Sequence, residues 1–388
     1  MDETLKAELL KQKQQGLYRQ RLISESAPGA HRVINGKSLL SFCSNDYLGL
    51  ANHPKIKKAF IEAAEQYGVG SGSAHLVNGH TRLHHDCEQR LAEFTGRERA
   101  LLFSTGYMAN LAITSALVGR GDTVFQDKLN HASLIDAAKL SDARFLRYKH
   151  NDLEQLQRLL SQRRKESPES RQLVMSDAVF SMDGDKADAS EISVLCEQSQ
   201  SWLMLDDAHG FGVLGEKGAG LCSEQNLSQK DVPILMATLG KAVGVSGAFV
   251  AGSEALIETL IQRSRSYIYT TASPPATAAA VIQSIELIEH EDWRREKLAE
   301  LIDYFRQQVS NLDVELMSSD TAIQPILIGD NHRAVSLSKQ LFERGIHVTA
   351  IRPPTVPQGT ARLRITLSAA HERQDIDVLI HTLSELLI

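Results

Sequence analysis

Residues 202–210 read WLMLDDAHG, and residues 233–241 read PILMATLGK. Each stretch begins with a short apolar run that is typical of a buried strand, and each ends in polar side chains. The first run delivers Asp206 and then His209, and the second delivers Thr238 and then Lys241. In open α/β sheets, ligands bind beyond the carboxyl ends of the strands. The two stretches therefore predict an α/β sheet with a ligand site where these strands end.

The side chains at the two strand ends indicate a particular cofactor chemistry. Lys241 is followed by small residues that include Gly244 and Gly247. A poorly solvated lysine releases its proton more easily, and the neutral amine can form a Schiff base with an aldehyde. A carboxylate such as Asp206 can keep a pyridine nitrogen protonated, so the pair suggests pyridoxal phosphate. Taken singly, Lys241 could be a solvated loop residue, and Asp206 with Asp207 could cap a helix.

The spacing of these motifs resembles a known family. Asp-Asp-Ala-His-Gly followed by Thr-Leu-Gly-Lys is similar to the fold-type I pyridoxal-phosphate enzymes, and specifically to the α-oxoamine synthases. The similarity extends over nearly the whole chain, from about residue 19 to residue 371, and the further matching segments are residues 44–50, 130–133, 179–185 and 351–357. The Pro-Pro-Thr-Val-Pro run at residues 353–357 is the most discriminating part, and it resembles the biotin-pathway branch of the family.

The resemblance implies an α/β architecture in three parts. We expect an N-terminal helix and short strand over residues 1–45, a large cofactor-binding domain with a mostly parallel central sheet over residues 46–280, and a smaller α+β domain over residues 281–388. A chain of 388 residues is long enough for one large α/β domain and a companion. Leucines on one face of residues 5–18 predict an amphipathic helix that packs against a larger body.

The composition is that of an ordinary globular protein. Hydrophobic residues make up 42% of the chain and charged residues 23%, and the formal net charge of −6 gives no indication of nucleic-acid binding. The four cysteines lie far apart in the sequence, which argues against a disulfide scaffold or a cysteine-rich metal site. We see no secretory signal and no membrane-spanning run, and we expect a cytoplasmic protein.

Residues 101–110 predict a phosphate site. They pass from an apolar strand through Ser104 and Thr105 into a helical pattern that begins near Gly106. The N–H groups and the dipole at a helix N-terminus suit a phosphate, although an ordinary capped helix would look the same. The resemblance assigns Gly106 and Tyr107 to cofactor binding. The family often has phenylalanine at the second position, which puts little in doubt because the backbone N–H is the useful group.

The resemblance also implies the roles of the remaining cofactor residues. His131 is expected to stack on the pyridine ring and to take part in catalysis and substrate binding, although a single histidine is more often a packed or capping residue. Ser181, His209 and Thr238 are expected to bind the cofactor, with His209 on the ring oxygen. Lys241 and Asp206 are expected to be catalytic as well as cofactor-binding, and no metal is expected.

The substrate residues are implied in the same way. Arg19 matches a position that contacts the acyl substrate, and Arg364 matches the position that binds the amino-acid carboxylate, to which Asn45 and Thr355 are added as further substrate-binding residues. Arg362 and Arg364 alternate along a predicted strand, so they share a face. A guanidinium can clamp a carboxylate through two hydrogen bonds. The alternative is solvated charge on an edge strand.

The implied activity is that of an acyltransferase that condenses an amino acid with an acyl thioester and releases carbon dioxide. For the biotin-pathway branch the substrates are L-alanine and a pimeloyl thioester, carried by acyl carrier protein or coenzyme A. We expect a homodimer in which Thr270 and Thr271 reach the phosphate site of the other subunit. The nearest alternative is a sister enzyme of the family that uses glycine and another acyl-CoA.

Two readings lie outside the family. Residues 244–248 fall one glycine short of the elbow that carries a hydrolase nucleophile, since residue 248 is alanine. A non-catalytic scaffold that binds an acyl carrier is the other alternative.

His80 and His84 could share a helix face, but Thr81 stands where the zinc-protease motif requires glutamate, so we do not predict a zinc site there.

Overall fold

The computed structural model describes residues 1–387, and these form two compact units. Of the described residues, the first unit comprises 1–49, 182–185 and 294–387, and the second comprises 50–181 and 186–293. The finer division at residues 45 and 280 stays a prediction. Over residues 1–387 we find no helix with both the length and the apolar character needed to cross a membrane.

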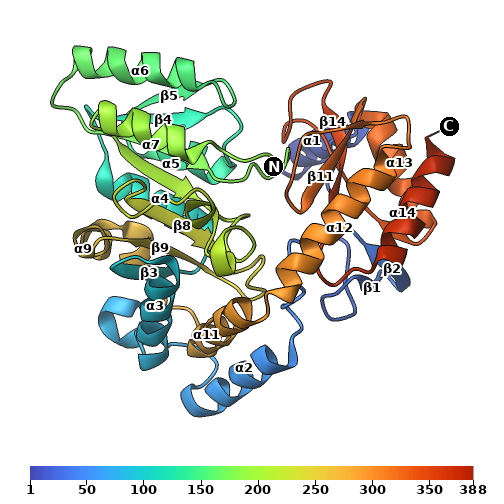
Figure 1. Ribbon diagram of the computed structural model, residues 1–388, viewed down its shortest axis with the longest axis horizontal. Helices are drawn as coiled ribbons and strands as arrows, with labels where there is room; N and C mark the ends of the chain where they lie inside the picture. Colours follow the sequence, from blue (N-terminus) through green and yellow to red (C-terminus); the bar gives the residue numbers. More distant parts are fainter. Residues whose placement is uncertain (388) are drawn as a thin grey trace. The chain divides into compact units, whose positions relative to one another are not determined.

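A seven-stranded sheet forms the centre of the second unit, in the order β3-β9-β8-β7-β6-β4-β5 (Figure 1). The pairs from β8 through β7, β6 and β4 to β5 are parallel, whereas β9 is antiparallel to both of its neighbours. The mostly parallel sheet expected from the sequence is therefore confirmed. The strands are β3 (Arg99–Phe103), β4 (Thr123–Asp127), β5 (Arg144–Tyr148), β6 (Gln172–Asp177), β7 (Trp202–Asp206), β8 (Ile234–Thr238) and β9 (Ala248–Gly252).

Helices cover both faces of this sheet. Along β7, Leu203 and Leu205 belong to one apolar cluster and Met204 to another, because successive side chains of a strand point to opposite faces. Strands buried on both faces read as continuous apolar runs, which explains the pattern of residues 202–206. The helices of this unit are α2 (Pro54–Tyr67), α3 (Arg82–Thr95), α4 (Gly106–Leu117), α5 (Ala132–Leu140), α6 (Leu153–Glu166), α7 (Ala189–Gln198), α8 (Leu221–Glu224), α9 (Glu254–Arg263), α10 (Arg265–Ile268) and α11 (Pro275–His290), with the short helices η1 (His75–Gly79) and η2 (Glu216–Gly218).

The first unit has two smaller sheets. One has the order β1-β2-β12 and the other the order β10-β11-β14-β13. The helices of this part are α1 (Asp2–Gln14), α12 (Trp293–Val309), α13 (Asn331–Glu343) and α14 (Arg373–Leu386). The strands are β1 (His31–Ile34), β2 (Lys37–Ser41), β10 (Glu315–Leu316), β11 (Ile323–Gly329), β12 (Ile346–His347), β13 (Thr349–Ile351) and β14 (Ala361–Thr366).

One expectation about the first unit and one alternative weighed for it are wrong. None of the described residues of α1 is buried, and Leu5, Leu9 and Leu10 are exposed, so the helix does not pack on its own chain through these leucines. Three leucines among lysine, glutamine and glutamate give only a narrow apolar stripe, too little to bury the helix. The edge-strand alternative for Arg362 and Arg364 also fails, because β14 lies between β11 and β13 and both side chains are buried.

Candidate active site

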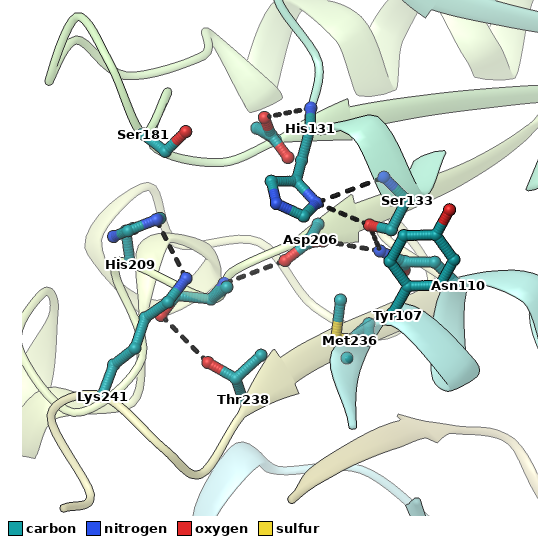
Figure 2. Close-up of a pocket in the computed structure, with 13 residues that line it drawn as sticks. Tyr107, Asn110, His131, Ser133, Ser181, Asp206, His209, Met236, Thr238 and Lys241 are labelled. Atoms are coloured by element: carbon teal, nitrogen blue, oxygen red, sulfur yellow. Dashed lines mark hydrogen bonds between the residues drawn. The ribbon is translucent and has the colours of Figure 1, made fainter. Parts of the chain in front are cut away.

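A cavity of about 190 Å³ opens where the parallel strands of the second unit end (Figure 2). Asp177 and Asp206 are directly paired at the ends of β6 and β7, and Thr238 ends β8. Every residue that we expected at the cofactor lines this cavity. The lining residues are Gly106, Tyr107, Asn110, His131, Ser133, Asp177, Ser181, Asp206, Ala208, His209, Met236, Thr238 and Lys241.

The half-buried Lys241 lies in the turn between β8 and β9 and faces His209 (Figure 2). Its Nζ is 2.9 Å from Nε2 of His209. Gly244 in this turn has φ of +71°, and a Cβ there would come within 2.5 Å of the backbone nitrogen of Ala51. The tight turn therefore requires glycine at this position, which is a second reason for small residues after Lys241.

Of the two adjacent aspartates, Asp206 lines the cavity. Its Oδ2 accepts a hydrogen bond from Nδ2 of Asn110 at 2.9 Å, and its Oδ1 accepts one from the backbone N–H of Ala208 at 3.1 Å. Asp207 is buried elsewhere and accepts from the N–H of Leu221 at 2.8 Å. Burial raises the pKa of Asp207 to about 8. The two neighbours therefore have different environments, and Asp206 is the one available to a ligand.

His131 precedes α5 and combines a capping role with a place in the cavity. Its Nδ1 lies 2.7 Å from Oγ of Ser133, and its backbone N–H donates to Oδ2 of Asp177 at 2.8 Å. Burial lowers the pKa of His131, and the charge of Lys241 acts in the same direction, whereas Asp206 opposes it. A lowered pKa favours the neutral form, in which an imidazole can lie against an aromatic ring.

Three polar residues of the cavity were not expected from the sequence: Asn110, Ser133 and Asp177. Burial raises the pKa of Asp177 well above its usual range, and the neighbouring Asp206 adds to the shift, while the N–H of His131 opposes it. The rule that polar residues at strand ends gather at one site could have found Asp177, since it ends β6 as Asp206 ends β7. Asn110 lies inside a helix, where no local signal marks it.

The first turn of α4 borders the cavity and offers donors for an anion. Thr105 caps the helix, and its Oγ1 accepts from the N–H of Met108 at 3.2 Å. The N–H groups of the first turn have no partner within their own helix, and the helix dipole favours negative charge there. A Cβ on Gly106 would lie 2.8 Å from Cγ2 of Thr238, so glycine at this position lets the start of the helix pack closely against Thr238. The side chain of Tyr107 instead donates to Asp136.

These groups fit pyridoxal phosphate. The cavity combines an amine at Lys241, a carboxylate at Asp206, an imidazole at His131 and a helix N-terminus at Gly106. They match in turn the aldehyde, the pyridine nitrogen, the ring face and the phosphate of that cofactor.

Apart from His131, the expected substrate residues belong to the first unit, and the structure brings two of them together. Nη2 of Arg364 donates to Oδ1 of Asn45 at 3.3 Å, and Nη1 donates to Oγ1 of Thr366 at 2.9 Å. Arg19 and Thr355 lie outside helices and strands and are exposed.

Arg362 has a different environment although it shares the face of Arg364. Its Nη1 donates to Oδ1 of Asp183 at 2.7 Å, and the guanidinium is almost completely buried. This ion pair indicates a structural role for Arg362 within the first unit.

The hydrolase alternative is wrong, because residues 244–247 form the turn between the antiparallel strands β8 and β9. A nucleophile elbow requires a turn from a strand into a helix. His80 and His84 do not share a helix face, since α3 begins at Arg82. The Nδ1 atoms of His75 and His80 instead face each other at 3.0 Å.

Comparisons with known proteins agree with the cavity chemistry. Residues 37–383 match the family model for aminotransferase class I and II. The 8-amino-7-oxononanoate synthases of Saccharophagus degradans and Pseudomonas savastanoi pv. phaseolicola are 54% and 55% identical to this chain. The first alignment covers 100% of this chain and 97% of its relative, and the second covers 99% and 96%.

Solved structures also resemble this chain over most of its length. Serine palmitoyltransferase from S. paucimobilis with a bound PLP–myriocin aldimine has a TM-score of 0.92 at 29% identity, with 99% of this chain and 96% of that chain covered. An 8-amino-7-oxononanoate synthase from Francisella tularensis has a TM-score of 0.78 at 34% identity, with 89% and 97% covered.

Proposed function

The chain belongs to the 8-amino-7-oxononanoate synthase family of pyridoxal-phosphate-dependent acyltransferases, and we propose that it joins L-alanine to a pimeloyl thioester in biotin biosynthesis. A carbon–carbon bond forms between the α-carbon of alanine and the thioester carbonyl. The carrier thiol and carbon dioxide leave, and 8-amino-7-oxononanoate is the product. The observation that carries the proposal is the single cavity lined by Lys241, Asp206 and His131, in a chain more than half identical to synthases of this name.

When bound, pyridoxal phosphate supplies an aldehyde that takes up an amine and a protonated ring that accepts the electron pair left by a broken bond at the α-carbon. We propose that Lys241 holds the aldehyde carbon and that its released amine then removes the α-proton of alanine. The contact between Nζ and Nε2 of His209 supports this role, because it fixes where the amine points. Asp206 keeps the proton on the pyridine nitrogen.

The remaining residues of the cavity bind and orient. The N–H groups of Gly106 and Tyr107 are proposed to bind the phosphate, with Thr238 beside them. Ser181 and His209 are proposed to face the phenolic oxygen. His131 covers the ring and excludes water from the reacting carbon.

Arg364 is the proposed anchor for the carboxylate of alanine. Its guanidinium is buried and oriented by Asn45 and Thr366, so it is already organised for a two-point contact with a carboxylate. Arg19 and Thr355 are proposed to contact the pimeloyl substrate and its carrier; their exposure suits a large, incoming donor.

We further propose that the enzyme is a cytoplasmic homodimer with Thr270 and Thr271 at the partner's phosphate site. The isolated bridge between Ala74 and Thr271 holds two loops together. Nearby in sequence, Val69 is 87% and Val77 is 77% exposed, which is unusual for valine and supports burial against a second copy. Sedimentation velocity at micromolar protein tests the dimer, and cell fractionation tests the location.

The activity is tested by offering L-alanine or glycine, each with pimeloyl-CoA, pimeloyl acyl carrier protein or acetyl-CoA. We expect 8-amino-7-oxononanoate by mass spectrometry only when alanine meets a pimeloyl donor, and the ratio of the two pimeloyl rates identifies the carrier. Faster turnover of glycine with another acyl-CoA would assign the chain to a sister activity and refute the proposal.

A further inference from the structure

A buried amide links the carboxylate and the imidazole of the cavity. Asn110 lies in α4 one turn after Gly106 and has no exposed surface. Its Nδ2 donates to Oδ2 of Asp206 at 2.9 Å and to Oγ of Ser133 at 2.8 Å, and Ser133 in turn contacts His131 (Figure 2). One side chain therefore connects both groups that are proposed to bind the cofactor ring, Asp206 directly and His131 through Ser133.

The chemistry of these groups sets the direction of each hydrogen bond. An ionised carboxylate only accepts, so the amide nitrogen and not the amide oxygen must face Asp206. The two amide hydrogens are then committed to Asp206 and Ser133. Because Oγ of Ser133 accepts from Asn110, its own hydrogen is left for Nδ1 of His131, 2.7 Å away. The backbone N–H of Ser133 also points to that nitrogen, at 3.3 Å.

Nδ1 of His131 is therefore an acceptor, and the neutral ring carries its hydrogen on Nε2. If the ring were protonated at Nδ1, a hydrogen would face the hydroxyl hydrogen of Ser133 unless that hydroxyl turned away. Asn110 opposes such a turn, because its N–H group occupies one lone pair of the Ser133 oxygen and so restricts where the hydroxyl hydrogen can point. The charged groups acting on His131 are Asp206 and Lys241 in the cavity, with Asp177 on its backbone N–H.

We propose that Asn110 is a positioning residue that orients the Asp206 carboxylate and fixes the tautomer of His131 at the same time. The inference rests on the proposed function, since it concerns the residues assigned to the cofactor ring. It accounts for a polar residue in a helix core, where apolar side chains are the usual occupants. A purely structural amide would also be expected to satisfy its oxygen, yet Oδ1 of Asn110 is buried without a hydrogen-bond partner among the described residues.

Three variants separate the two arms of this network from general damage to α4. Asn110→Leu is close in volume and donates to neither side. Ser133→Ala breaks only the arm to His131 and leaves the bond from Asn110 to Asp206. Thr114→Val is the control, because Thr114 lies one turn further along α4, is equally buried, and bonds the carbonyl of Asn110 and the sulfur of Met175 outside the cavity.

The first readout is the nitrogen NMR spectrum of His131 in the cofactor-free protein, assigned among the 14 histidines with a His131→Asn variant. In the unchanged protein we expect hydrogen on Nε2 and none on Nδ1. Asn110→Leu and Ser133→Ala should both raise the pKa of His131 by about half to one pH unit, the equivalent of one hydrogen bond. Thr114→Val should leave the titration unchanged.

The second readout is the dissociation constant of pyridoxal phosphate, measured by absorbance titration. Asn110→Leu should weaken binding about tenfold, because the Asp206 carboxylate loses an oriented donor, whereas Ser133→Ala should change it less than about threefold. Thermal melting of each cofactor-free variant checks the fold. If Asn110→Leu melts far below the Thr114→Val control, Asn110→Ala replaces it; that variant adds no bulk to the helix core and also loses both donations.

Hydrogen on Nδ1 of His131 in the unchanged protein would overturn the proposal, as would a folded Asn110 variant with unchanged titration and unchanged cofactor affinity. Neither readout involves alanine or a pimeloyl donor. The expected NMR and binding results together with an inactive synthase assay would therefore leave the positioning role standing and refute only the substrates.

Discussion

Nζ of Lys241 and Nε2 of His209 lie 2.9 Å apart although 32 residues separate them in the sequence. The contact arises because β7 and β8 are parallel neighbours, and each of the two side chains comes three residues after the end of its strand. The imidazole therefore orients the amine before any ligand enters. The turns after the two strands therefore add an imidazole and an amine to the Asp206 carboxylate that ends β7.

Replacing the imidazole tests that contact. His209→Phe keeps a ring of similar width but removes the nitrogen that faces Lys241. We expect kcat to fall about tenfold, the equivalent of one hydrogen bond, with a smaller change in the KM for alanine. Steady-state kinetics at saturating pimeloyl donor measures both constants. A variant with the kcat of the unchanged enzyme would show that the contact does not orient the amine.

Asp207 gives a pH-dependent prediction for stability. Burial raises the pKa of its carboxyl to about 8 in the folded protein, above the usual value of 3.8. The unfolded chain therefore releases this proton first, and the folded state loses stability as pH rises from about 4 towards 8. Asp207→Asn removes that loss, so its melting temperature relative to the unchanged protein should rise by about 2 °C or more between pH 5 and pH 8. If the difference in melting temperature between the two proteins stayed constant from pH 5 to pH 8, the Asp207 carboxyl would not be buried in its neutral form.

Gly106 provides a test of the phosphate site. Gly106→Ala places a methyl group against Cγ2 of Thr238, a residue that lines the cavity, and we expect pyridoxal phosphate to bind about tenfold more weakly. Thr238→Ser removes that Cγ2 while keeping the hydroxyl, so adding it to Gly106→Ala should restore part of the affinity. Absorbance titration of the single and double variants measures the coupling. If the effects of the two single variants on affinity simply add, the clash between the new methyl group and Cγ2 of Thr238 does not cause the weaker binding.

Arg364 and Arg362 share a face of β14 but should respond differently to substitution. Arg364→Leu should raise the KM for alanine by about a hundredfold with little change in melting temperature, because it removes the proposed carboxylate anchor. Arg362→Leu should instead cost about 3 kcal/mol of folding free energy, since it leaves Asp183 without its buried partner. Alanine kinetics and urea unfolding of both variants distinguish the roles. If only Arg362→Leu raised the KM for alanine, the carboxylate anchor would be Arg362 and not Arg364.

Much of the cofactor cavity could be predicted from sequence because strand ends concentrate the signal. The apolar runs before Asp206 and Thr238 are continuous, as strands buried on both faces must be, so the position of each strand end was clear. The family motifs then drew attention to His131 and Lys241. The same reasoning applied to β6 would have added Asp177.

Other features depend on tertiary packing that local sequence does not encode. Asn110 occupies a helical position that reads as core, and only the approach of α4 to β7 brings it to Asp206. The alternation of Arg362 and Arg364 is the same for an edge strand and a central one, so their burial could not be predicted. The narrow leucine stripe of α1 suggested packing that its own chain does not provide.

The central claim is that Lys241 and Asp206 act on one molecule of pyridoxal phosphate, and borohydride reduction of the cofactor-loaded enzyme tests it most directly. Peptide mass mapping should find the reduced cofactor attached to Lys241 alone, and Lys241→Ala should bind the cofactor without becoming labelled. Asp206→Ala should still be labelled at Lys241 but should lose activity by about a hundredfold or more. Labelling of a different lysine, or near-normal turnover of Asp206→Ala, would contradict the account.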